Sequence, residues 1–246
     1  MSVTGMARNN KALKESRIHH SQELVDAAYT LTRDQKRILW LFLADIEDSE
    51  KVGVKVNAEM GTLEFNLQAY ESIYNVSPHE ASRDVREALS GFKDREVKLY
   101  LPEESSNTEM ATDELPWLGK KSYRPKRGSY TVYFNPYLIP FLGNIKESVA
   151  PRFKTLEQLS NPLHVRMYTK LIESDALKQC ELEVSWMIER YELPKTYSRY
   201  SNFKQKFLTP CIEKIRKLEG MGNLEYKELK NNPERKRAVS TIVFTW

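Results

Sequence analysis

Apolar residues along this chain change their spacing several times, and the changes predict a series of helices and strands. Residues 24–28 and 38–46 carry apolar stripes at helical spacing. Residues 54–67 then alternate between apolar and polar, which predicts strand, and residues 68–74 return to helical spacing. The first quarter of the chain is therefore expected to contain helices on both sides of a strand region.

Helix starts are marked by capping residues. Thr32 and Gln35 have the spacing of a capping box, in which each side chain satisfies a backbone N–H group of the first turn. Ser77 followed by Pro78 supplies an N-cap and a proline at the first helical position. Apolar residues at helical spacing follow over 81–92, so a longer helix is predicted to begin at Pro78.

Two strands are predicted after that helix, at residues 96–101 and 129–134, because both segments alternate apolar and polar positions. Residues 102–128 between them are polar and contain several Pro and Gly residues. We therefore predict a loop there, too long for a tight hairpin.

The second half of the chain repeats this order of elements. The pattern predicts a helix at 161–171, a strand at 181–184, a short helix at 185–191, a helix at 202–218, and strands at 224–229 and 239–245 joined by a loop at 230–237. Residues 66–76 also match 183–193 position by position, and residues 129–134 resemble 240–244. The same order occurring twice indicates a duplicated module.

Each module reads helix, strand, helix, helix, strand, loop, strand, which is the order of a helix-turn-helix with a β-wing. The predicted fold class is α+β, with two tandem winged-helix domains related by an internal pseudo-repeat. Gly143, Asn144 and Pro151 interrupt the pattern and place the boundary near 143–152. We expect a flexible tail at 1–20 and domains at 21–145 and 150–246.

Composition limits the other possibilities. With 40% apolar residues in 246, the chain has enough material for two packed cores. No apolar stretch approaches the roughly 20 residues that cross a bilayer, and residues 1–14 lack the apolar segment of a secretory signal, so a cytoplasmic protein with no membrane partner is expected. Cys180 and Cys211 lack metal-site spacing, so we expect them buried, with no metal and no cofactor.

Charge is distributed unevenly. Residues 1–115 contain 14 Lys and Arg against 21 Asp and Glu, a net of −7, and residues 116–246 contain 24 against 13, a net of +11. A basic C-terminal half favours a polyanionic partner such as nucleic acid, although ordinary scatter of charge over solvated faces remains the alternative.

The predicted second helix of each helix-turn-helix, which is the third helix of its module, carries side chains suited to DNA, because the guanidinium fork of arginine fits both guanine edges and phosphate oxygens. The alternative for the first module is a solvated helix in which Arg86 pairs with a neighbouring carboxylate. The candidates are Ser82, Arg83 and Arg86 in the first module, and Arg199, Ser201, Asn202, Lys204 and Lys206 in the second.

Both predicted wing loops are basic. Such clusters would contact the phosphate backbone, which positions a protein on DNA and makes binding salt-sensitive. The candidates are Lys121, Arg124, Lys126 and Arg127 in the first wing, with Lys120 beside them, and Arg235, Lys236 and Arg237 in the second.

Four segments resemble the plasmid replication initiators that bind iterons. They are LTRDQKR at 31–37, EAS at 80–82, NPYLIPF at 135–141 and WMIERY at 186–191. The similarity extends from about residue 22 to residue 246, and the segment at 135–141 is the specific one.

This resemblance implies two winged-helix domains that bind directly repeated iterons of double-stranded DNA at a plasmid origin as a monomer. It also implies recruitment of a host initiator and helicase, and a homodimer, formed mainly through the N-terminal domain, that binds an inverted repeat and represses its own promoter. In one such relative, DnaK-type chaperones convert dimer to monomer. The resemblance places recognition at the helix positions named above, and Lys204-Gln205-Lys206 departs from three arginines in that relative. Because lysine cannot form the bidentate fork, the iteron that is read stays open.

Other classes fit less well. A DNA-nicking initiator would use paired His residues separated by one position on a strand, whereas His19 and His20 are adjacent. No P-loop motif is present, so an ATPase is not expected, and we predict no enzyme activity. A winged-helix transcriptional regulator shares all the physical features above and is the main alternative. The two basic wings argue against a protein-only scaffold.

Overall fold

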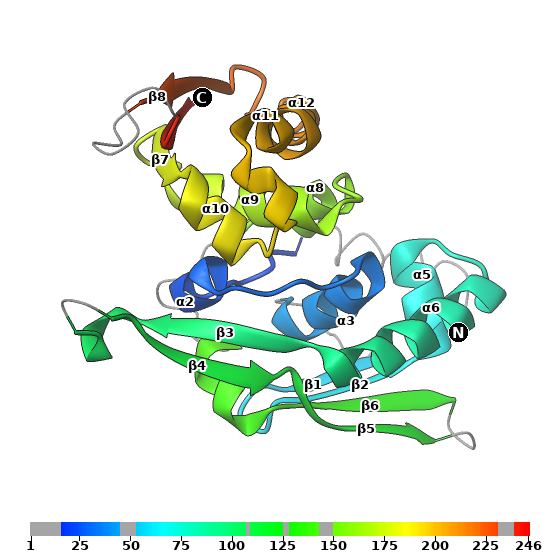
Figure 1. The fold of residues 1–246 in the computed structure, drawn as a ribbon. Helices are drawn as coiled ribbons and strands as arrows, with labels where there is room; N and C mark the ends of the chain where they lie inside the picture. Colours follow the sequence, from blue (N-terminus) through cyan, green and yellow to red (C-terminus); the bar gives the residue numbers. More distant parts are fainter. Residues whose placement is uncertain (1–15, 45–52, 107–108, 125–127, 143–149, 231–238) are drawn as a thin grey trace. The chain divides into compact units, whose positions relative to one another are not determined.

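In the computed structural model, residues 16–44, 53–106, 109–124, 128–142, 150–230 and 239–246 are described (Figure 1). The chain forms two compact units. The N-terminal unit contains residues 1–24 and 31–154, and the C-terminal unit contains residues 25–30 and 155–246. The sequence predicted one boundary near 143–152. The C-terminal unit also contains the short segment 25–30, which precedes most of the N-terminal unit in the chain.

The helices of the N-terminal unit begin where the capping residues indicate. Helix α3 (Arg33–Leu43) follows Thr32, and helix α6 (Pro78–Gly91) follows Ser77, and both starts form capping boxes, so these predictions are confirmed. Helix α5 (Leu67–Tyr74) precedes α6 and is capped by the side chain of Asn66. Helices α3, α5 and α6 lie on one side of the sheet (Figure 1).

The sheet of the N-terminal unit has the strand order β1-β2-β6-β5. Its strands are antiparallel and comprise β1 (Val54–Asn57), β2 (Thr62–Asn66), β5 (Leu118–Arg124) and β6 (Ser129–Phe134). Phe65, Val132 and Phe134 are fully or almost fully buried beneath the helices, together with Ile38 and Val85. Two short elements, η4 (Pro136–Leu138) and α7 (Ile139–Leu142), follow the sheet.

The predicted loop at 102–128 is wrong. Strand β3 (Glu96–Leu101) pairs with β4 (Ala111–Pro116) as a separate two-stranded sheet, and a short turn η2 (Pro102–Glu104) follows β3. Strand β5 pairs instead with β6. The sequence pattern did not reveal β4 and β5 because neither strand buries a continuous face. The alternation of apolar and polar residues that identifies a half-buried strand is therefore absent from both.

The C-terminal unit has the expected winged-helix order. Helix α9 (Pro162–Glu173) begins after the N-cap Asn161, strand β7 (Gln179–Glu183) leads into α10 (Val184–Arg190), and α11 (Tyr200–Phe203) starts a helix that continues to Ile215. Strands β8 (Glu225–Leu229) and β9 (Thr241–Thr245) complete a sheet of order β7-β9-β8. A two-domain winged-helix α+β fold is therefore confirmed.

The internal repeat extends to details of geometry. The order β7-β9-β8 reproduces β2-β6-β5, and the aligned residues Asn75 and Glu192 both have left-handed backbone, with φ of 50° and 48°. Val76 N–H donates to the carbonyl of Glu71, as Leu193 N–H does to that of Ile188, which is the Schellman ending of both second helices. The first helix of the helix-turn-helix, α5 or α10, therefore ends in the same way in both units.

An arginine–tyrosine pair is repeated as well. Arg37 lies four residues after the first residue of α3, and its guanidinium carbon is 4.7 Å from the ring centre of Tyr74. Arg166 lies four residues after the first residue of α9, 4.9 Å from the ring centre of Tyr191. Each pair joins the first helix of its unit to the end of the second.

The first described residues differ from the expected flexible tail. Residues 1–15 lie outside the described part, but Ile18 is fully buried and His20 almost so, and Ile18 forms a β-bridge to Ala44. The prediction of a flexible tail is therefore wrong for residues 16–20, because apolar Ile18 packs inside the N-terminal unit. Helix α2 (Gln22–Asp26) follows directly.

Cys180 and Cys211 are buried, as predicted. Burial raises the pKa of the Cys211 thiol, so the thiolate is disfavoured. Among the helices within the described ranges, each is too short or too polar to cross a membrane.

Candidate DNA-binding surfaces

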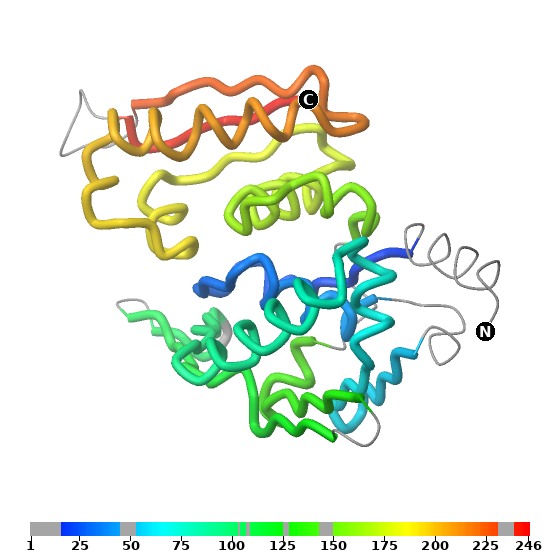
Figure 2. Tube along the Cα trace, turned by 90° about the vertical axis from the view of Figure 1, so that its right-hand side faces the viewer, coloured from blue at the N-terminus to red at the C-terminus, as the bar shows by residue number. Residues whose placement is uncertain are grey.

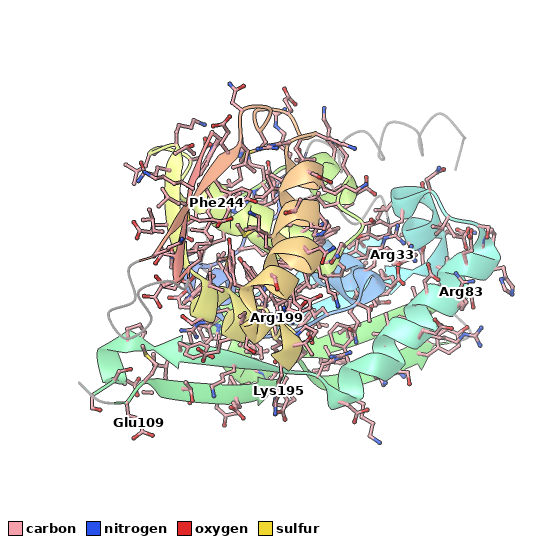
Figure 3. All side chains as sticks on the ribbon, turned by 45° about the horizontal axis from the view of Figure 1, so that its top comes forward. Arg33, Arg83, Glu109, Lys195, Arg199 and Phe244 are labelled. Atoms are coloured by element: carbon pink, nitrogen blue, oxygen red, sulfur yellow. The ribbon has the colours of Figure 1, made fainter. Side chains whose placement is uncertain are left out.

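The outer face of α6 carries the candidates of the N-terminal unit. Arg83 and Arg86 are exposed and Ser82 is half-buried. Arg86 Nε donates to the carbonyl oxygen of Ser82 at 3.0 Å, an acceptor within its own helix rather than the carboxylate considered as the alternative. Both side chains therefore lie on the solvent side of the helix, and Arg83 is labelled there in Figure 3.

Asp84 orients part of this face from below. Its side chain is 4% exposed, and Arg83 on α6 and Arg33 on α3 approach its carboxylate at 2.8 Å and 3.5 Å. Arg37 lies 3.9 Å away. The two outer guanidinium groups remain half-exposed, at 50% for Arg33 and 49% for Arg83. Arg33 also pairs with Asp34 at 2.9 Å. The two carboxylates thus bring two arginines from neighbouring helices together, an arrangement that can bind a phosphate.

Arg33 is absent from the candidates drawn from the sequence. It directly follows the Thr32 cap, so it stands at the first position of α3, where backbone N–H groups and a positive helix end add to its charge. That position was readable in the sequence. Its closeness to Asp84, which lies 51 residues further on, required the tertiary fold.

Glu80 has a structural role. Its carboxylate accepts hydrogen bonds from the Ser77 hydroxyl at 2.7 Å and the Ser77 backbone N–H at 2.9 Å. These bonds lower the pKa of Glu80, which stabilises the charged form at the start of α6. Any contact of Glu80 with a base edge would have to replace this cap.

The first wing is formed by β5, β6 and their connection. Tyr123 stacks on Tyr130 with ring centres 4.6 Å apart. Burial and Tyr123 raise the pKa of Tyr130, and the charge of Arg86 opposes the rise. Arg124 is exposed at the end of β5. Lys126 and Arg127 fall outside the described residues.

Two lysines of the first wing lie on a strand rather than in a loop. Lys121 on β5 donates to the carbonyl oxygen of Leu89, in the last turn of α6. Lys120 lies 5.4 Å from the ring centre of Tyr133. Lys121 therefore satisfies the C-terminal end of α6, where a cation is favourable, and a phosphate would have to compete with that carbonyl.

The helix at 200–215 of the C-terminal unit contains a π-turn. Helix α11 is followed by the π-helical η6 (Lys204–Leu208) and by α12 (Thr209–Ile215), and the trace is continuous (Figure 2). Thr209 N–H donates to the carbonyl of Lys204, five residues earlier. Pro210 explains this, because it has no N–H and its ring would clash with the Lys206 carbonyl in a regular α-helix.

The candidates of this helix differ in how they are held. Arg199, Ser201 and Lys206 are exposed, and Arg199 lies at the start of the helix (Figure 3). Asn202 Nδ2 donates to the Thr196 carbonyl at 3.0 Å, which ties η5 (Lys195–Ser198) to the helix. Lys204 forms an ion pair with Glu228 on β8 instead of standing free.

The second wing consists of β8, β9 and their connection. Its strands pair in register from Glu225 opposite Thr245 to Leu229 opposite Thr241. Arg235, Lys236 and Arg237 fall outside the described residues, so their placement stays a prediction. The strands themselves confirm that this basic segment joins β8 to β9.

Taken together, each unit combines a helix with exposed cationic side chains and a wing with basic residues in or beside its connection. This chemistry suits a groove of double-stranded DNA with flanking phosphates. Within the described ranges, no group of three or more His, Cys, Asp or Glu side chains is placed to bind a metal ion.

Residues 17–172 match the family described as "Initiator Replication protein, WH1", and residues 183–246 match the family described as "Initiator Rep protein, WH2". An uncharacterized 27.6 kDa protein of Escherichia coli is 27% identical over 211 residues, covering 82% of this chain and 85% of the relative.

A solved structure has the same fold over nearly the whole chain. The crystal structure of the Pi initiator protein in complex with iteron DNA has a TM-score of 0.68 and 18% identity, covering 94% of this chain and 96% of that chain. At this identity the likeness establishes the shared fold alone.

Proposed function

This chain belongs to the initiator replication protein family with WH1 and WH2 domains, and we propose that it initiates plasmid replication by binding iterons at the origin. The observation that carries the proposal is the duplicated unit, in which a cationic helix face and a wing occur together in both copies. Two such units on one chain suit two successive stretches of one duplex.

Residue roles follow from exposure and chemistry. We assign base or phosphate contacts to Ser82, Arg83 and Arg86 from α6, and to Arg199, Ser201, Asn202 and Lys206 from the helix at 200–215. Wing contacts to phosphate are assigned to Arg124, Lys126, Arg127, Arg235, Lys236 and Arg237. We add Arg33, because Asp34 orients it at 2.9 Å and it shares the Asp84 carboxylate with Arg83 at 3.5 Å. Lys121 and Lys204 are engaged within the protein and receive other roles.

The finer account follows the sequence resemblance to the F-plasmid initiator at residues 31–37 and 135–141. As a monomer, the protein would bind directly repeated iterons, help open the origin, and recruit the host initiator and helicase. As a homodimer formed through the N-terminal unit, it would repress its own promoter at an inverted repeat. Chaperones of the DnaK type would control the balance between the two forms. The protein acts by binding, without a catalytic step of its own.

A footprint on the DNA flanking its own gene tests the proposal. We expect protection of several directly repeated sites at a regular spacing, and a plasmid carrying that region should replicate only when the intact gene is supplied. Protection of a single inverted repeat with no effect on replication would instead identify a transcriptional regulator. Absence of any preferred site would contradict both functions.

Replacing Lys126 and Arg127 together with Ala is expected to weaken binding to all duplexes alike. Each lost phosphate contact should reduce the slope of log affinity against log salt by about 0.9. The measurement is a salt titration with iteron and random duplexes. Replacing the exposed Lys55 and Lys93 with Ala is the charge-matched control. An unaltered slope for the Lys126 and Arg127 variant would show that the first wing lies off the DNA.

A further inference from the structure

The recognition helix of the C-terminal unit is linked to its wing by a charge pair. Lys204 Nζ, in the π-turn, lies 2.7 Å from Glu228 Oε1 on β8. The Lys204 side chain is 45% exposed and that of Glu228 28%. Among the basic candidates of this helix, Lys204 is therefore the one that the described structure holds against a carboxylate.

The surroundings of Glu228 stabilise its negative charge. Burial raises the pKa of Glu228, but the hydrogen bond from Lys204, the neighbouring Tyr200 and the charge of Lys230 outweigh it and lower the pKa overall. Burial and the same carboxylate raise the pKa of Tyr200, so its hydroxyl stays protonated beside Glu228. A fixed anion thus stands two residues before Lys230, at the base of the basic second wing.

A carboxylate in this position is unfavourable for phosphate binding. DNA affinity that does not depend on sequence comes from cations that release counterions, and Glu228 both repels phosphate and occupies one such cation. The pair also spans the helix and the wing, so it restricts where the Lys204 ammonium can go. A lysine without this restraint could reach any nearby phosphate, because its ammonium group has little directional preference.

We propose that Glu228 is a specificity-determining residue, which holds Lys204 against the wing and thereby lowers the affinity of the C-terminal unit for DNA of unrelated sequence. The proposal rests on the proposed function, since it concerns how the DNA-binding surface discriminates among duplexes. The ligand whose binding Glu228 weakens is the phosphate backbone of a duplex without an iteron. The iteron would gain less from release of Lys204, because its binding depends more on base contacts from side chains such as Arg199.

Glu228→Gln tests this by removing the charge while keeping the shape and the hydrogen-bonding oxygen. We expect binding to a random duplex to tighten roughly three- to tenfold at low salt, with a salt slope steeper by about 0.9. Iteron binding should change less, so the ratio of iteron to random affinity should fall. Glu225→Gln is the matched control, because Glu225 lies on the opposite face of the same strand and is exposed.

A second pair of variants shows whether the effect passes through Lys204. In the Lys204→Met background, Glu228→Gln should leave the salt slope unchanged, since no cation remains to be released. If Glu228→Gln weakens random and iteron binding equally, or behaves like Glu225→Gln, the pair is a structural link and the proposal is overturned. If the unchanged protein does not prefer iteron to random DNA, the proposed function fails instead. Random-duplex binding of the variants can be measured in either case.

Discussion

Arg166→Met is expected to lower the free energy of unfolding of the C-terminal unit by about 3–5 kcal/mol. Arg166 is 5% exposed, and its guanidinium donates to the backbone carbonyls of Ala27, Tyr29 and Arg190, at 2.6 Å for Tyr29 and 2.7 Å for Arg190. Its guanidinium carbon also lies 3.9 Å from the ring centre of Tyr29. Methionine fills a similar volume but offers no N–H group to those buried carbonyls.

Hydrogen–deuterium exchange of the full chain measures this loss. We expect faster exchange of amides in α9 and α10, with α3 of the N-terminal unit unchanged. Arg216→Met is the control, because Arg216 is exposed and its Nε donates to the carbonyl of Leu224. That change should cost about 1 kcal/mol or less. Equal protection of α9 in the Arg166 variant and the unchanged protein would contradict the role given to this arginine.

The same contacts explain why residues 25–30 belong to the C-terminal unit. Arg166 binds the carbonyls of Ala27 and Tyr29, Lys170 pairs with Asp26 at 2.7 Å, and Thr30 donates to Glu192 at 2.8 Å. A fragment that starts after residue 30 would lack these partners. A C-terminal domain prepared for DNA-binding studies should therefore include this segment.

Arg199→Ala is expected to reduce iteron affinity by about 1–3 kcal/mol, roughly 5- to 150-fold, if the side chain reads a base. Arg199 is exposed at the start of the helix, where side chains enter the major groove in this class of domain. Affinity for the random duplex should fall much less, because the variant loses only one positive charge that can contact a phosphate. Competition binding with iteron and random duplexes measures both values.

Lys217→Ala removes the same charge from an exposed position beyond the end of α12, and it should leave the discrimination unchanged. A contact with phosphate alone would make Arg199→Ala weaken both duplexes equally. Discrimination equal to that of the unchanged protein would remove Arg199 from the base-reading set.

Capping boxes and buried alternation made much of the fold predictable. Thr32 and Ser77 mark helix starts because each caps its helix through a residue three positions later in the sequence. Both partners of the cap can therefore be identified from the sequence alone. Strand β6 was predicted with its bounds because it is buried along nearly its whole length. Strands β4 and β5 were missed because they are mostly exposed, and the basic residues Lys121 and Arg124 were consequently placed in a loop.

The candidate site was predictable in composition but not in connection. The sequence identified Arg83 and Lys204 as cations on recognition helices. It could not reveal that Asp84 joins Arg83 to Arg33, or that Glu228 binds Lys204, because each partnership spans more than 20 residues. The spacing of apolar residues did not predict the π-turn before Pro210, although a proline inside a helix indicates an irregular turn.

By itself, the sequence determined the two helix-turn-helix modules, their capping and the excess of positive charge in the second half. The modules, the caps and the charge excess depend on composition and on residues close together in the sequence. Backbone and solvation effects between such residues decide these features without distant contacts. Only the tertiary structure decided that residues 25–30 complete the C-terminal unit, and which cations are neutralised by carboxylates. Those outcomes depend on buried polar groups finding partners from distant parts of the chain, and the cost of leaving such a group unsatisfied selects one arrangement.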